Sequence, residues 1–316
     1  MLDALKFVQG AVGKNDLAPE LTHFRIQGGR ITGYNGRLVL SSPIACDLDC
    51  CPRAEPLIKA IKACEETAQL HMTPTGKLAI RSGSFRSHVD CLPEVFAGVD
   101  PAGVFIELDG KLLPVMRKLF DVTSEDASRP WAGGILFDGH SAFATNNVVA
   151  AEFWLGYFFP FRINVPRYAI KELLRIGEEP ERMQIETHSA TFYFESGRWL
   201  RTQLIDIGWP DIRALLDAMP ATDSAVPSAL FETLERISSF TAKDGRIVFK
   251  AGAIATANDD DGTTIECAGI PSGPIFNIEM LQVLEGIATT IGFEAYPSPC
   301  PFYGEGTRGA IVGLRT

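Results

Sequence analysis

The chain has 316 residues, of which 46% are hydrophobic and 22% charged, a composition typical of a globular protein with two or three domains. No apolar run approaches the roughly 20 residues of a membrane-spanning helix, the first ten residues lack a signal-peptide pattern, and seven scattered cysteines indicate no disulfide framework. We therefore expect a cytoplasmic protein with reduced cysteines and no contact with membranes. The net charge of −10 argues against a protein that is basic over its whole surface, but it allows a locally basic one.

The first third of the chain predicts a unit of two helices and two strand pairs. Residues 2–12 have apolar side chains at three- and four-residue spacing, typical of a helix with one buried face. Residues 24–38, FRIQGGRITGYNGRL, have the pattern strand, tight glycine turn, strand. A second amphipathic helix follows Pro52-Arg53, and period-2 alternation from 77 to 89 predicts a hairpin. The unit ends near 100–101, where Pro, Asp and small residues cluster.

The second third of the chain repeats this order. A helix is predicted at 110–120, a strand pair at 135–149 (ILFDGHSAFATNNVV), a second helix after Pro166-Arg167 and a hairpin at 191–205. The two Pro-Arg pairs are 166 − 52 = 114 residues apart, and the Ser-Gly dipeptides of the two hairpins are separated by the same distance, 196 − 82 = 114. Independent marks therefore agree on one period.

The last third of the chain predicts a third copy. It has a helix at 227–240, a strand pair at 246–260 (RIVFKAGAIATANDD) and a helix within 270–287 that lacks the Pro-Arg pair. The equivalent positions in the three strand pairs are Asn35, Asn146 and Asn258. Their offsets are 146 − 35 = 111 and 258 − 146 = 112 residues. Repeats of about 110 residues are too long for a solenoid, so we expect a few large domains that share sheets edge to edge.

The predicted fold class is thus α+β, with three repeated domains that each pack two helices on antiparallel sheets. The predicted domains are 1–101, 102–222 and 223–316. The second boundary is placed in the cluster of Pro, Asp and small residues at 220–223. The three aspartates at 259–261 are expected to form a solvated turn.

The order and spacing of these stretches resemble the β sliding clamp, the processivity subunit of bacterial-type DNA polymerase III, in a shortened, bacteriophage-like version. The similar segments are LAIRSGSFRSHVDCLPEVF, INVPRYAIKELLR, LRTQLIDIGWPDIRALL and the terminal AIVGLRT. Trp209-Pro210-Asp211 stands where the family has Phe-Pro-Asp. The resemblance implies a closed ring of six domains, made by head-to-tail dimerisation of two chains, with helices lining the hole and edge strands paired between chains.

The same resemblance implies a DNA polymerase processivity factor that encircles double-stranded DNA without sequence specificity. If helices line the hole, basic side chains on them should contact phosphates. Arg167, Lys171 and Arg175 recur at i, i+4 and i+8, which places them on one helical face. Lys14 follows the first helix, and the third domain is poor in basic residues. The predicted DNA-binding residues are Lys6, Lys59, Lys62, Lys111, Arg117, Lys118, Arg167, Lys171, Arg175 and Arg236. The alternative is that such residues are simply solvated surface.

Clamps of this family also bind short peptides of DNA polymerase and the clamp loader, in an apolar pocket partly built from a Thr-Asp-Gly-His segment. Asp138-Gly139-His140 looks like that motif, but the repeat register aligns Asp138-Gly139 with the hairpin turn at Gly28-Gly29. We therefore expect His140 to be a turn residue. The predicted pocket residues are Thr145, Asn147, Val148, Ala150, Pro220, Val312, Gly313 and Leu314. The alternative is that Val148 and Val312 are core strand residues.

The sequence contains few features that indicate an enzyme. The cysteines and histidines of the first third of the chain could in principle form a zinc site or a Cys-His pair. They lack the paired C-x-x-C or H-x-x-x-H spacing of such sites; they are Cys46, Cys50, Cys51, His71, His88 and Cys91. No Gly-rich phosphate loop is present, so we expect no cofactor and no ATP hydrolysis, which fits a clamp opened by a separate ATPase. The rival interpretation is a duplicated α+β hydrolase or isomerase with catalytic groups such as Glu152, His188 or Asp206 at a domain junction.

Overall fold

The computed structural model describes residues 1–13, 18–65, 67–256 and 262–315. The chain divides into two compact units, each built from two separate stretches. Unit 1 comprises 1–113 and 168–204, and unit 2 comprises 114–167 and 205–316. Lys14, Asn258 and the predicted aspartate turn lie outside the described residues. The two predicted boundaries between the three domains stay predictions.

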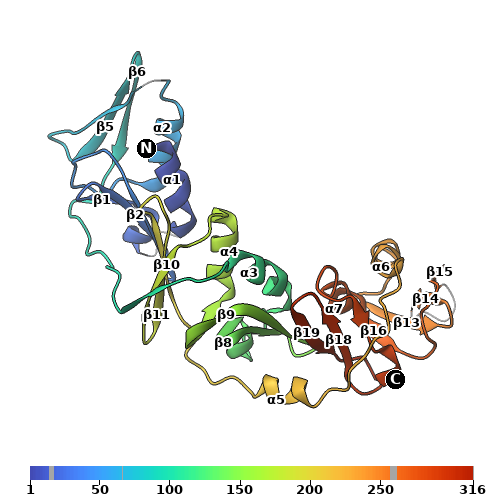
Figure 1. Ribbon diagram of the computed structural model, residues 1–316. Helices are drawn as coiled ribbons and strands as arrows, with labels where there is room; N and C mark the ends of the chain where they lie inside the picture. The colour runs from blue at the N-terminus through green and yellow to red at the C-terminus, as the bar shows by residue number, and fades with distance from the viewer. Residues whose placement is uncertain (14–17, 66, 257–261, 316) are drawn as a thin grey trace. The chain divides into compact units, whose positions relative to one another are not determined.

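Unit 1 contains a seven-stranded antiparallel sheet in the order β1-β2-β3-β12-β11-β10-β7 (Figure 1). Its strands are β1 (Arg25–Gln27), β2 (Arg30–Tyr34), β3 (Leu38–Pro43), β7 (Val104–Glu107), β10 (Arg182–Glu186), β11 (Ser189–Tyr193) and β12 (Trp199–Gln203). A three-stranded sheet consists of β4 (Gln69–Met72), β5 (Lys77–Ser82) and β6 (Phe85–Asp90). Strands from the first and second predicted domains thus share one sheet.

The helices of unit 1 are amphipathic, as their residue spacing predicts. The unit contains α1 (Leu2–Val8), the 3-10 turns η1 (Gln9–Ala11) and η2 (Pro19–Thr22), α2 (Ala54–Lys62) and all but the first residue of α4 (Arg167–Ile176). α2 buries Leu57 and Ile61, and α4 buries Ile170 and Leu173, so each helix buries one stripe of apolar side chains. α2 begins directly after Pro52-Arg53, and α4 begins at the arginine of Pro166-Arg167, so the helix predicted at each Pro-Arg pair is confirmed.

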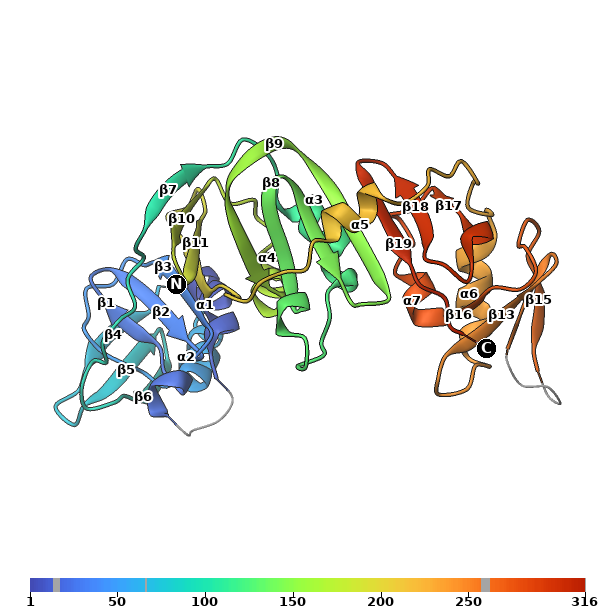
Figure 2. The same cartoon turned by 90° about the horizontal axis from the view of Figure 1, so that it is seen from below.

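Unit 2 contains a five-stranded sheet in the order β17-β18-β19-β9-β8 and a four-stranded sheet in the order β15-β14-β13-β16 (Figure 2). The strands are β8 (Gly134–Thr145), β9 (Val149–Pro166), β13 (Arg246–Lys250), β14 (Ala253–Thr256), β15 (Thr264–Glu266), β16 (Ile275–Asn277), β17 (Thr290–Ile291), β18 (Cys300–Gly304) and β19 (Thr307–Ile311). The helices are α3 (Leu113–Leu119), η3 (Phe120–Val122), η4 (Pro130–Ala132), α5 (Ile212–Asp217), α6 (Leu230–Ser238), α7 (Ile278–Gln282) and η5 (Phe293–Ala295).

The strand pair predicted at 135–149 differs from the prediction at its turn. Gly28 and Gly29 do form a tight turn between β1 and β2, both with positive φ. The chain does not reverse at Asp138-Gly139, however, because β8 continues to Thr145 and pairs along its whole length with β9. The register shifts on both sides of Gly139, whose φ is +63°, and β9 has more residues than β8 between the paired positions, so the bulged residues belong to β9. The prediction that His140 is a turn residue is wrong, since His140 lies within strand β8, opposite the irregular part of β9.

The core of unit 2 is rich in aromatic side chains. Phe249, Phe276 and Phe293 are fully or almost fully buried, and their ring centroids lie 5.1 to 5.7 Å apart. Rings at this spacing and at steep angles add specific edge-to-face contacts to the hydrophobic effect. These contacts join β13, β16 and η5. No helix in the described part of the chain is long and apolar enough to span a membrane.

Candidate nucleic-acid interface and partner site

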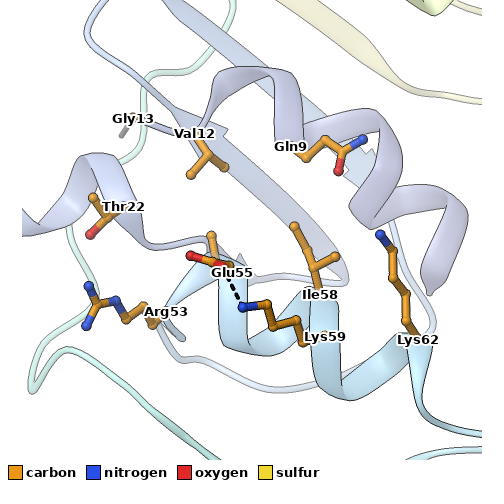
Figure 3. Close-up of a pocket in the computed structure, with 10 residues that line it drawn as sticks. Gln9, Val12, Gly13, Thr22, Arg53, Glu55, Ile58, Lys59 and Lys62 are labelled. Carbon is orange, nitrogen blue, oxygen red and sulfur yellow. Dashed lines mark ion pairs between the residues drawn. The ribbon is translucent and has the colours of Figure 1, made fainter. Parts of the chain in front are cut away.

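A basic groove lies beside α2 in unit 1. A cavity of about 650 Å³ opens between the end of η1 and α2, with Gln9 and Thr22 on its wall. Arg53, Lys59 and Lys62 bring three cations to it, and Glu55 brings one carboxylate that pairs with Lys59 at 2.6 Å (Figure 3). This pair holds the pKa of Glu55 below its ordinary value, first through the hydrogen bond from Lys59. The groove therefore keeps an excess of positive charge that can attract a phosphate backbone.

The basic stripe predicted on α4 is only partly available to a ligand. Arg167 donates to the Glu125 carboxylate at 3.1 Å, and its guanidinium lies 3.9 Å from the centre of the Phe120 ring. Arg175 donates to Glu172 and to the backbone oxygen of Phe7 at 2.9 Å, near the C-terminal end of α1. Both guanidinium groups thus hold parts of the protein together. Lys171, between them on the helix, is exposed.

The remaining predicted DNA-binding residues differ in exposure. Lys118 is half-buried, with its ammonium 5.3 Å from the centre of the Phe153 ring. Lys6 is exposed and lies 3.7 Å from Asp3, a weak surface pair. Among the ten predicted DNA-binding residues, those that are exposed and have no described ion pair are Lys62, Lys111, Arg117, Lys171 and Arg236. Together with the groove beside α2 they are the candidates for the nucleic-acid interface, three of them in unit 1 and two, Arg117 and Arg236, in unit 2.

Strand pairing in unit 2 brings together most of the predicted peptide-site residues. Thr145 pairs with Ala150 across β8 and β9, and Ala150 pairs with Ala310 of β19. The backbone N–H of Val312 donates to the oxygen of Val148 at 2.8 Å. Since alternate residues of a strand share a face, Thr145, Ala150 and Val312 lie on one side of the five-stranded sheet.

The exposure of these residues separates ligand-facing groups from core groups. Thr145 is 2% exposed, and its hydroxyl donates to the oxygen of Val149 at 2.7 Å, so it acts as a buried turn residue. Val312 is 41% exposed, which argues against the core interpretation for this residue. Val148 is half-buried. The segment after Val312 is held by Leu314, whose N–H donates to Ile275 and whose oxygen accepts from the Tyr296 hydroxyl at 2.7 Å. Gly313 lies between these anchored residues.

Asn147 and Pro220 complete the predicted set. Asn147 has a φ of +71° at the tip of the β8–β9 hairpin, and its backbone N–H donates to the Thr145 hydroxyl. Pro220 is exposed, and its oxygen lies 3.5 Å from the hydroxyl of Tyr303 in β18. A peptide-binding role for the whole set stays a prediction.

The groups considered for catalysis are occupied or dispersed. Both carboxylate oxygens of Glu152 are used, one by the Ser141 hydroxyl at 2.5 Å and one by Arg308 at 2.6 Å. Cys50 donates to Cys91 and thereby lowers the pKa of the Cys91 thiol, whereas its own pKa is raised. No group of three or more His, Cys, Asp or Glu within the described ranges is arranged to hold a metal ion.

The sequence reasoning missed one group of exposed side chains. Trp154 and Phe158, both in β9, are 55% and 60% exposed, and the His140 ring stacks on the indole of Trp154. The signal was available in the aromatic-rich segment FWLGYFFPF, residues 153–161, whose alternation of exposed and half-buried side chains is that of a strand with one open face. Its partner His140 could not be predicted, because the contact with Trp154 depends on the irregular register of β8 against β9.

No protein-family model matches the chain, and no curated protein is similar to it. Solved structures are similar over the whole chain. The β sliding clamp of Caulobacter crescentus has a TM-score of 0.80 and 18% identity, with 100% of this chain and 97% of that chain covered. The DNA polymerase β subunit of Streptococcus pyogenes has a TM-score of 0.80 and 17% identity over the same shares.

A third similar structure contains a bound ligand. The Pseudomonas aeruginosa sliding clamp bound to griselimycin has a TM-score of 0.79 and 18% identity, again with 100% of this chain and 97% of that chain covered. Three clamps from three genera thus match the same complete chain, although fewer than one residue in five is identical. From end to end, the chain has the fold of the bacterial β sliding clamps.

Proposed function

We propose that this protein is a sliding clamp, a ring that encircles double-stranded DNA and acts as a processivity factor for a DNA polymerase. The observation that supports this most strongly is the fold match at a TM-score of 0.80 across the entire chain. A match to one repeated domain would leave many functions open, because one fold hosts many activities. A match over the whole chain is more restrictive, since it covers all the copies of the predicted repeat in their order.

The candidate nucleic-acid interface supports the same proposal. The exposed cations Lys62, Lys171 and Arg236 belong to helices α2, α4 and α6, one in each predicted domain. Phosphate contacts of this kind carry no sequence information and weaken with salt, which suits a protein that must move along DNA. An acidic remainder of the surface, with a net charge of −10, would limit binding elsewhere.

Ring closure requires a second copy of the chain. Edge strands leave backbone N–H and C=O groups without a strand partner, and β4 of unit 1 and β15 of unit 2 are such edges in the described part of the chain. Head-to-tail pairing of edges between two copies would satisfy these groups and close a six-domain ring with two-fold symmetry. These unpaired edges are the ground on which we propose a homodimer. As a factor of DNA replication, the protein would be located in the cytoplasm of a bacterial cell.

The surface formed by Val148, Ala150 and Val312 would bind peptides of the DNA polymerase and the clamp loader. An exposed apolar side chain at the end of a sheet is the kind of anchor that peptide recognition uses. A solved structure of the Pseudomonas aeruginosa clamp is bound to griselimycin, and we propose that this compound also binds this chain, at the surface formed by Val148, Ala150 and Val312. The low identity of 15 to 18% to bacterial clamps fits a divergent copy carried by a bacteriophage. The protein would have no catalytic activity of its own.

Retention on DNA tests the proposed function directly. The purified protein is loaded onto nicked circular plasmid by a clamp loader from the same host. It should stay bound at 0.5 M NaCl, about three times the physiological salt concentration, and should be lost when the plasmid is linearised. Sedimentation should give twice the mass of one chain. Equal loss from circular and linear plasmid, together with a monomeric mass at all accessible concentrations, would exclude a ring.

A further inference from the structure

A second cavity lies in unit 2, on the same sheet face as the candidate peptide site. It has a volume of about 550 Å³ and is walled by β8, β9, α5 and the turn between β18 and β19. The residues used below are His140, Glu152, Trp154, Asp217, Gly306 and Arg308. Drug-sized ligands and large side chains occupy pockets of about 300–1,000 Å³, so the cavity is large enough for a bulky side chain.

The charged groups in the cavity are already paired with one another. Arg308 donates to Glu152 at 2.6 Å and to Asp217 of α5 at 2.7 Å. Burial lowers the pKa of Arg308, but the hydrogen bonds to the two carboxylates outweigh it, so the pKa lies above its ordinary value. The nearby Arg213 lies 5.1 Å from the centre of the Phe143 ring and donates to a backbone oxygen. These cations have little capacity left for a phosphate.

The aromatic wall of the cavity is open to solvent. Trp154 is 55% exposed, and the His140 ring stacks on it with centroids 5.0 Å apart and planes 20° apart. Phe158, 60% exposed, meets His140 edge-on at 5.3 Å. Exposed clusters of large apolar side chains mark interaction sites more often than chance. The irregular pairing of β8 with β9, with register shifts on both sides of Gly139, lies at this cluster.

We propose that this cavity takes a large apolar or aromatic side chain of the partner peptide that the clamp tethers. The inference rests on the proposed function and extends its peptide site. Ala150, Glu152 and Trp154 alternate along β9 and therefore face the same side, so the cavity continues the surface formed by Val148, Ala150 and Val312. Four residues of strand separate Ala150 from Trp154, roughly 13 Å, which an extended peptide spans with about four residues. Paired charges and open aromatic rings favour such an anchor over a nucleotide.

Titration with small amides tests the cavity by itself. The probes are N-acetyl-phenylalaninamide, N-acetyl-alaninamide and thymidine 5′-monophosphate, and the readouts are the indole N–H signal of Trp154 and the backbone amide of Gly306 by NMR. The chain has four tryptophans, and Trp154→Phe identifies the relevant signal. The aromatic amide should shift both signals saturably, with a dissociation constant on the order of 1 mM for so small a ligand. Trp154→Ala should weaken the response at Gly306 at least tenfold, whereas Phe240→Ala, at another exposed aromatic, should not.

The outcomes separate this inference from the proposed function. Equal, non-saturating shifts with the phenylalanine and alanine amides would overturn it, and stronger binding of thymidine 5′-monophosphate would replace it with a nucleotide site. Retention on circular DNA is measured on the same preparation. Saturable binding of the aromatic amide without retention would exclude the clamp function, and with it the tethered peptide, while retention without binding would exclude only the anchor site.

Discussion

Asn35 and Asn146 occupy the same position in two hairpins of the chain, and each closes its turn with its own side chain. The Oδ1 atom of Asn35 accepts from the N–H groups of Arg37 and Leu38 at 3.1 and 2.9 Å. The Oδ1 atom of Asn146 accepts from Val148 and Val149 at 3.0 and 2.8 Å. Asparagine favours such turns because its short amide reaches the backbone two residues on. The repeat detected as a sequence offset of 111 residues is therefore also a repeat of hydrogen bonds.

Replacing either asparagine by alanine should destabilise the protein. Two hydrogen bonds to the turn are lost, each worth about 0.5–1.5 kcal/mol net, so Asn146→Ala should lower the free energy of unfolding by about 1–3 kcal/mol. Urea unfolding followed by circular dichroism measures the change. Asn146→Asp keeps the accepting oxygen and is the control. An equal loss in both variants would show that the turn does not depend on this acceptor.

The two carboxylates that hold Arg308 should contribute unequally to stability. The side chain of Glu152 is 11% exposed and that of Asp217 is 59% exposed. The Glu152 carboxylate is largely buried and makes a charged hydrogen bond to Arg308, so Glu152→Gln should cost about 1–3 kcal/mol. Asp217→Asn should cost less than about 1 kcal/mol, as exposed pairs do. Thermal unfolding of both variants and of the double variant decides this; a larger loss in Asp217→Asn would contradict the assignment.

Cys91 should be alkylated faster than Cys46, although both thiols are half-buried. The hydrogen bond from Cys50 lowers the pKa of Cys91, while burial raises the pKa of Cys46. A lower pKa gives more thiolate at a given pH, so the alkylation rate of Cys91 should reach half its maximum at a lower pH. Iodoacetamide labelling from pH 6.5 to 10, read by peptide mass spectrometry, measures both rates.

The control for this experiment is Cys50→Ala. Loss of the donor should raise the pKa of Cys91 and shift its rate profile to higher pH. A profile that does not move would mean that Cys50 does not set the reactivity of Cys91.

Three exposed lysines on helices should carry part of any DNA affinity. The triple variant Lys59→Ala, Lys62→Ala and Lys171→Ala should bind linear duplex more weakly. Each phosphate contact contributes about 0.9 to the slope of log affinity against log salt, so the slope should fall by about 2–3. Fluorescence anisotropy at several salt concentrations measures it. The matched control removes three basic residues from strands, namely Lys77, Arg86 and Lys250. The same fall in slope in the control would show only a general charge effect.

Val312→Asp should weaken griselimycin binding at least tenfold if the surface formed by Val148, Ala150 and Val312 is the peptide site. A carboxylate at a 41% exposed apolar position adds a desolvation cost to burying the ligand there. Isothermal titration calorimetry gives the affinity. Val104→Asp, at a 61% exposed valine in unit 1, is the control and should leave binding unchanged. Equal affinities for the wild-type protein and Val312→Asp would place the site elsewhere.

The local elements were largely predictable because they depend on neighbours in the chain. Apolar spacing predicted α6 with both ends within three residues, and the two Pro-Arg pairs predicted where α2 and α4 begin. Period-2 alternation predicted β5 with β6, and Gly28-Gly29 predicted the β1–β2 turn. Such patterns determine which side of an element is buried, and that requirement is written in the sequence itself.

What the sequence could not determine depends on distant residues. Strand β8 continues through Asp138-Gly139 because it pairs with β9, and this pairing satisfies the backbone N–H and C=O groups of both strands. A local bulge costs less free energy than losing the hydrogen bonds between the two strands. The engagement of Arg167 and Arg175 is decided by Glu125 and by the end of α1. The sequence can show that a basic residue lies on one face of a helix, but only tertiary packing determines which carboxylate or backbone oxygen it pairs with. The sequence therefore determined the repeat, the element types and the α+β class, whereas tertiary packing alone decided which charged and aromatic side chains are left open to a ligand.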